Sequence, residues 1–67
     1  MNAIQQSVQI LGSQKALADA IGVSQAYVSH FMTGRRTVTP ELCVRIEKAT
    51  RGKVKRKTIR PDIFGNS

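Results

Sequence analysis

The stretch "QKALADAIGVSQAYVSHF", residues 14 to 31, is the most regularly patterned part of this 67-residue chain. Its apolar and small residues recur at helical spacing on both sides of Gly22, and Ser13 and Ser24 stand where the two helices would begin. A glycine closes a helix at this point at no steric cost, because it adopts a left-handed conformation freely. We therefore predict two short helices joined by about three residues, with Ala18 as the small residue that lets them approach.

The spacing of this stretch matches a helix-turn-helix. Counted from Gln14, each place where that motif requires an apolar, small or glycine residue is filled, by Leu17, Ala18, Ile21, Gly22, Val23, Val28 and Phe31. A plain helical hairpin within a bundle would need the same spacing and is the alternative. It does not explain the outer face of the second helix of the pair, so the helix-turn-helix is favoured.

Glycine and proline punctuation predicts the rest of the fold. We expect a helix at Asn2–Leu11 stopped by Gly12, a helix from Ser24 to Gly34, a helix opened by Thr39 and Pro40 that runs to Gly52, and one short turn at Lys55–Ile59, broken before Pro61 and followed by an extended tail. Nothing alternates with the period of a strand. The predicted fold class is all-α, a compact bundle of about four to five short helices that contains the helix-turn-helix. Residues 1–52 form the helix-turn-helix domain, and residues 53–67 a basic C-terminal extension with one short helix and a partly flexible tail.

The charge of the chain is concentrated in its second half. Residues 1–33 hold one Lys and one Asp, whereas residues 34–67 hold ten Lys or Arg and three Asp or Glu, which gives the whole net charge of +7. The excess of positive charge in residues 34–67 favours binding to a polyanion. A merely solubilising basic surface is the alternative for a charge run taken alone.

The outer face of the predicted helix after Ser24 is polar but uncharged. Steps of three and four residues place Gln25, Ala26, Ser29, His30 and Thr33 on one side. Glutamine can pair bidentately with adenine, serine can donate or accept, and an alanine methyl can pack on a thymine methyl. We expect the first four of these residues to read bases of double-stranded DNA.

Cations are expected to grip phosphate without reading sequence, which explains why they lie apart from the neutral face. Arg35 and Arg36 follow the helix directly and should lie beside the sugar-phosphate backbone, as should Thr33. Lys15 stands near a helix N-terminus, which favours phosphate.

Several residues have simpler interpretations. His30 is also read as a solvated histidine, Tyr27 as a core or boundary aromatic, and Cys43 as a small buried hydrophobe. The basic cluster of Lys53, Lys55, Arg56 and Lys57 has three open alternatives: binding phosphate, binding an acidic partner, or plain solvation.

Composition argues against several other classes of protein. A 67-residue chain is one small domain that would struggle to build an ordinary active-site cleft, and no nucleophile, base and orienting group occur together. We therefore expect no enzyme, no cofactor and no small-molecule substrate. The single Cys43 offers no internal disulfide and no metal cluster. No apolar run or signal segment suggests a membrane or export, so a cytoplasmic location is expected.

The chain resembles the Cro-type repressors of temperate phages and the YdaS-like regulators of prophage regions. The resemblance runs from Gln14 over nearly the whole remainder, through "G-V-S-Q-x-x-V-S", "P-E-x-C-x-x-I-E-x-A-T-x-G" and "R-P-D-I-F". It implies a lambda-repressor-like DNA-binding fold. It further implies that Gln14 touches phosphate and braces the next helix, that Ser24 is a backbone-contacting cap, and that Gln25, Ala26 and Ser29 or His30 read bases. The chain departs from the subgroup at Lys55, Arg56 and Lys57, where a Thr and acidic residues usually begin the last short helix.

The favoured function is a sequence-specific transcriptional repressor of phage or prophage type that binds a palindromic operator as a dimer. Such dimers place one recognition helix in each half-site, about 34 Å apart. We expect a weak homodimer, assembled on DNA, whose surface is the fourth helix and the residues after Gly52. The alternative is an antitoxin-like module that binds a protein partner and regulates itself through DNA.

Overall fold

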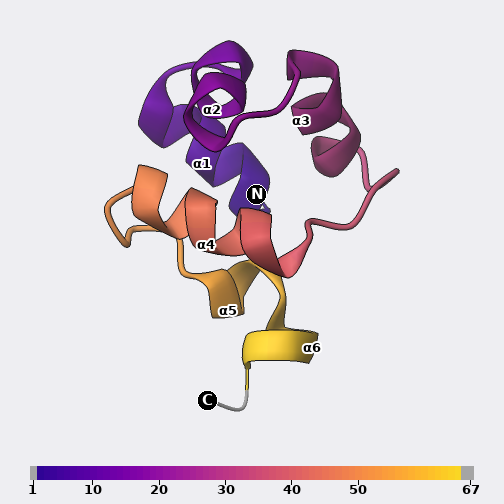
Figure 1. Ribbon diagram of the computed structural model, residues 1–67, viewed down its shortest axis with the longest axis vertical. Helices are drawn as coiled ribbons and strands as arrows, with labels where there is room; N and C mark the ends of the chain where they lie inside the picture. Colours follow the sequence, from indigo (N-terminus) through magenta and orange to yellow (C-terminus); the bar gives the residue numbers. More distant parts are fainter. Residues whose placement is uncertain (1, 66–67) are drawn as a thin grey trace.

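The computed structural model describes residues 2–65, and within that range the chain forms six short helices and no strand. They are α1 (Ala3–Leu11), α2 (Gln14–Ile21), α3 (Gln25–Met32), α4 (Pro40–Ala49), α5 (Arg56–Ile59) and α6 (Pro61–Phe64). The predicted all-α class and the predicted positions of the first four helices are confirmed. Figure 1 shows α2 and α3 at one end of the long axis, α4 crossing the middle, and α6 at the opposite end.

The helix ends follow the predicted caps. The hydroxyl oxygens of Ser13, Ser24 and Thr39 accept hydrogen bonds from Ala16 N, Tyr27 N and Leu42 N. Such caps satisfy backbone N–H groups that have no partner inside the helix. The first helix begins one residue later than predicted, because Asn2 is itself the cap and forms a capping box with Gln5.

The prediction of an extended tail after Pro61 is wrong. Pro61 does end α5, but it also occupies the first turn of α6, where its missing N–H costs nothing and its fixed φ suits a helix. The N–H groups of Ile63 and Phe64 donate to the carbonyl oxygen of Arg60. The described part of the chain therefore holds six helices rather than four or five.

One hydrophobic core joins the helices. Its buried apolar residues are Ile4, Leu17, Ala18, Ile21, Val28, Phe31, Val38, Leu42, Cys43, Ile46 and Val54. Cys43 is the small buried hydrophobe that was predicted, and burial raises the pKa of its thiol. Val54 lies beyond Gly52, so the basic extension contributes to the same core; the domain boundary at Gly52 stays a prediction.

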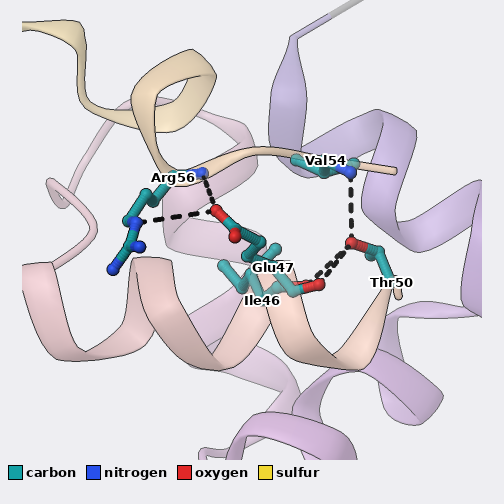
Figure 2. A network of polar contacts seen from close by, with 5 residues as sticks. All are labelled: Ile46, Glu47, Thr50, Val54 and Arg56. Carbon is teal, nitrogen blue, oxygen red and sulfur yellow. Dashed lines mark hydrogen bonds and ion pairs between the residues drawn. The ribbon is translucent and has the colours of Figure 1, made fainter. Parts of the chain in front are cut away.

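Polar contacts hold the connection between α4 and α5 against α4. The Thr50 hydroxyl donates to the carbonyl oxygens of Ile46 and Glu47, at 2.9 and 3.2 Å, and accepts from Val54 N at 3.1 Å (Figure 2). The Glu47 carboxylate accepts from Arg56 N at 2.8 Å. The buried Thr50 hydroxyl and the N–H of the buried Val54 thus satisfy each other, which is what placing polar groups of a loop on a core requires.

Candidate nucleic-acid interface

The turn between α2 and α3 has the geometry that a helix-turn-helix requires. Gly22 has φ +79°, in the left-handed region, and its N–H donates to Ala18 O at 2.9 Å. Val23 N donates to the same carbonyl oxygen at 3.0 Å. Ala18 itself is fully buried, and its small side chain lets α2 and α3 pack directly against each other. The predicted turn is confirmed.

The inner face of α3 anchors that helix on the core. Val28 and Phe31 are buried, and Tyr27 packs edge-on against Phe31 with ring centroids 4.9 Å apart. Tyr27 is half-buried, in agreement with its interpretation as a boundary aromatic. This packing fixes which side of α3 faces solvent.

The outer face of α3 carries the four residues predicted to read bases. Gln25 and Ala26 are exposed, and Ser29 and His30 are half-buried. Among residues 2–65, none of the side chains of Gln25, Ser29 and His30 forms a hydrogen bond or ion pair. Their donors and acceptors are therefore free for an outside partner, and the face they form is uncharged when His30 is neutral.

Residues at the two ends of α3 are partly committed to local contacts. The Ser24 hydroxyl oxygen accepts the capping bond from Tyr27 N at 3.2 Å, and its own proton can still be donated. The Thr33 hydroxyl donates to His30 O at 3.3 Å and is exposed. Both hydroxyls remain accessible at the helix ends, where phosphate contacts were predicted.

The loop after α3 presents the two predicted arginines. Gly34 has φ +79°, and the N–H groups of Arg35 and Arg36 both donate to His30 O, at 2.9 and 3.4 Å. Both side chains are exposed. The Arg36 guanidinium lies 5.1 Å from the ring centroid of Tyr27, a cation–π contact that restricts its orientation. The structure thus places two cations at the C-terminal end of the neutral face.

A second set of predicted contacts lies at the start of α2. Gln14 is half-buried and Lys15 exposed, both in the first turn of the helix that packs against α3. Within the described range Lys15 has no ion-pair partner. It adds a free cation beside a helix N-terminus, where unpaired N–H groups favour an anion.

The basic cluster of the extension is divided. Arg56 lies over the ring of Phe64 and pairs with Glu47 (Figure 2), whereas Lys53, Lys55 and Lys57 are exposed and form no ion pair within residues 2–65. In Figure 1, α4 lies between α5 and the pair α2 and α3. An exposed lysine without an ion pair is compatible with binding phosphate, with binding an acidic partner and with plain solvation, so these three alternatives stay open.

One contact was not foreseen from the sequence. Arg60 lies 22 residues after Val38, yet its Nη1 donates to Val38 O at 2.8 Å, in the connection that carries Arg35 and Arg36. No local pattern indicates a contact across that separation. The only sequence signal was the "R-P-D" part of the quoted "R-P-D-I-F" motif.

Two classes of site are not seen in the described part of the chain. No three His, Cys, Asp or Glu residues there lie close enough to hold a metal ion. None of its helices is long and apolar enough to cross a membrane.

Comparison with known proteins places the chain in a family. The family described as "Bacterial toxin YdaS" matches residues 4–67. The chain belongs to the YdaS family. It is 39% identical over 61 residues to the Escherichia coli (strain K12) protein YdaS, whose name describes it as a candidate transcriptional regulator. That alignment covers 91% of this chain and 62% of the E. coli protein, so this YdaS-family chain spans less than two thirds of that relative's length.

A solved structure confirms the fold of this YdaS-family chain. The Cro protein from a candidate prophage element, Xfaso 1, of Xylella fastidiosa strain Ann-1 is 43% identical and superposes with a TM-score of 0.88. The match covers 97% of this chain and 98% of the Cro protein. The resemblance to Cro-type and YdaS-like proteins is therefore confirmed, and so is the fold it implied.

Proposed function

We propose that this YdaS-family protein is a sequence-specific DNA-binding transcriptional repressor. The observation that carries the proposal is the outer face of α3: an exposed to half-buried face without Lys, Arg, Asp or Glu, which has free hydrogen-bonding groups and is followed directly by two exposed arginines. Neutral groups can read base edges in the major groove, and the arginines can hold phosphate beside it. The names of the relatives, a candidate transcriptional regulator and a prophage Cro protein, support the same function.

Within this proposal each predicted residue has a role. Gln25, Ala26, Ser29 and His30 read bases, while Gln14, Lys15, Ser24, Thr33, Arg35 and Arg36 contact the DNA backbone. The side chains that read bases lie on one helix, and the backbone contacts lie at its two ends and at the start of α2. This is the arrangement by which a recognition helix is held in the major groove.

The protein acts in this proposal as a weak homodimer on a palindromic operator. One α3 enters each of two half-sites, which two-fold symmetry relates. The fourth helix and the residues after Gly52 form the dimer surface, since α2 and α3 are taken up by the core and by DNA. Ile63 in α6 is an exposed large hydrophobic residue in that region, which supports the assignment. A cytoplasmic location follows from binding chromosomal DNA in a bacterial cell.

The experiment that tests the proposal is a DNA titration across salt concentrations. If about four to eight phosphates are neutralised per dimer, affinity for duplex DNA should fall by orders of magnitude between about 50 and 200 mM salt. Selection from a random duplex library should then return a palindromic site, which ultracentrifugation should show bound by two protomers. An affinity indifferent to salt, or a selection that enriches no sequence, contradicts the proposal.

A second candidate is a module that binds a protein partner and regulates itself through DNA, as an antitoxin does. The family description contains the word toxin, and this is the observation that favours the second candidate. Co-expression with the product of a neighbouring gene, followed by size-exclusion chromatography, distinguishes the two. A stable complex supports the second candidate, and separate elution supports the first.

A further inference from the structure

The connection from α3 to α4 is held at two points. At its start, the carbonyl oxygen of His30 accepts hydrogen bonds from the N–H groups of Arg35 and Arg36. At its end, the side chain of Val38 is buried, and the Val38 carbonyl oxygen accepts a hydrogen bond from Arg60 at 2.8 Å. The two exposed arginines are bonded at the first point, and Arg36 precedes the second point by only two residues.

Arg60 is well suited to hold the second point. Its Nε and Nη2 donate to the two carboxylate oxygens of Asp62, at 2.9 and 2.6 Å, which leaves Nη1 for Val38. A bidentate pair fixes the plane of a guanidinium as well as its position. Pro61, between the two partners, restricts the backbone that joins them. Arg60, Pro61 and Asp62 together form a clamp, and we use that name for these three residues.

The clamp lies beside one of the proposed phosphate contacts. Arg36, Val38 and Arg60 line the same hollow of the surface, together with residues at the start of α1. Most of the Arg60 side chain is covered, with 20% exposed, whereas Arg35 and Arg36 are exposed. Three of its five N–H donors are used by Asp62 and Val38, and this together with its burial argues for a supporting position rather than for direct phosphate binding.

We propose that Arg60, held by Asp62, is a positioning residue that fixes the connection from α3 to α4 so that Arg35 and Arg36 meet phosphate. The "R-P-D" sequence thereby gains a role in DNA binding from outside the helix-turn-helix. This inference rests on the proposed function. It adds that part of the affinity for DNA of any sequence depends on a contact from the C-terminal extension.

Asp62→Asn is the most discriminating variant, because it raises the net charge by one and yet should weaken binding. Once the bidentate pair is lost, the connection must be ordered on binding, and affinity for all duplexes should fall by roughly threefold to tenfold. Asp19→Asn is the matched control, since Asp19 is exposed on α2 and forms no ion pair within residues 2–65. The control should keep or slightly raise affinity. An affinity that rises equally in both variants overturns the proposal, because a freed Arg60 would then be binding phosphate itself.

Two further measurements complete the test. In a cycle that combines Arg60→Gln with the Arg35→Ala/Arg36→Ala variant, the salt slopes should be non-additive, the combined variant matching Arg35→Ala/Arg36→Ala; additive slopes overturn the proposal. Without DNA, ¹⁵N relaxation of the Arg60→Gln protein should show order parameters at Arg36 and Thr37 falling from about 0.85 toward 0.6, and unchanged values overturn it. If wild type binds no DNA, the proposed function has failed, and relaxation still decides whether Arg60 fixes the connection.

Discussion

The guanidinium of Arg36 lies over the ring of Tyr27, 5.1 Å from its centroid, and so a cation in the loop after α3 is held by a residue of α3 itself. Tyr27 in turn packs edge-on against the buried Phe31. The proposed phosphate contact is therefore tied to the core through two aromatic rings. The position of the loop proposed to bind phosphate is therefore fixed relative to the helix proposed to read bases.

Tyr27→Leu tests this relation. The variant keeps an apolar side chain but loses the cation–π contact and the aromatic pair, each of which is worth about 0.5 to 1.5 kcal/mol. We expect the free energy of unfolding to fall by about 1 to 2 kcal/mol in a urea titration. Combining it with Arg36→Ala should show coupling between the two sites; additive losses would mean that the ring does not hold the arginine.

Gly22 and Gly34 offer a matched pair for the turn geometry. Both have φ +79°, where an alanine costs about 1 to 2 kcal/mol, but a Cβ at Gly22 would lie 3.2 Å from Nη1 of Arg45, whereas a Cβ at Gly34 meets nothing within 4 Å. That Nη1 donates to Ile21 O at 3.0 Å. Gly22→Ala should therefore lower the free energy of unfolding more than Gly34→Ala. Equal losses would show that Arg45 moves aside freely.

Gly22→Val adds a β-branched side chain at the same φ. It should cost about 1 kcal/mol or more in the free energy of unfolding, because such residues strongly disfavour that region. Thermal melts of the wild type and the variant check this. If the variant melts at the same temperature as the wild type, Gly22 does not have the positive φ described here.

Thr50→Val tests the buried turn drawn in Figure 2. The variant keeps the shape of the side chain but leaves Val54 N, buried with its residue, without its acceptor. An unsatisfied buried donor costs about 1 to 3 kcal/mol, so we expect that loss of the free energy of unfolding. Thr50→Ser keeps the hydroxyl and should lose less, about the value of one methyl group, roughly 0.8 kcal/mol. Equal losses in both variants would show that the hydrogen bond from Val54 N to the Thr50 hydroxyl does not cause the loss of stability.

The clamp gives a pH dependence with a definite sign. The hydrogen bond from Arg60 holds the pKa of Asp62 below its ordinary value. A carboxyl whose pKa is lower in the folded state stabilises the fold above its unfolded pKa, near pH 4, and that stability is lost as the pH falls through the folded value. The melting temperatures of wild type and Asp62→Asn should therefore converge as the pH falls below about 4. A difference that stays constant over this range contradicts the pairing.

Local signals in the sequence were sufficient for most of the fold and for the composition of the candidate interface. Ser13, Ser24 and Thr39 cap helices because capping depends on contacts within three residues, and Gly22 turns the chain because its φ is a property of the residue. The neutral face of α3 follows from helical spacing alone. The roles of its residues in reading bases and holding phosphate stay predictions.

Two features could not be read from local spacing. Pro61 was interpreted as a breaker before an extended tail, because the same residue that ends α5 can also begin a helix, and only the following backbone decides between them. The contact of Arg60 with Val38 spans 22 residues and depends on how α5 packs on the core. Contacts of this kind arise from tertiary packing, which sequence periodicity does not encode.

The central claim of this account is that the neutral face of α3 reads bases while the adjoining cations grip phosphate. Its most direct test is a titration of three variants, Gln25→Ala, His30→Ala and Arg35→Ala, against a selected operator and a scrambled duplex at several salt concentrations. The first two should lose about 1 to 3 kcal/mol of specific affinity and keep non-specific binding, whereas Arg35→Ala should weaken both duplexes alike and make the salt slope shallower by about one unit. If Arg35→Ala abolishes discrimination while Gln25→Ala and His30→Ala leave it intact, the assigned roles are reversed and α3 is not the helix that reads the major groove.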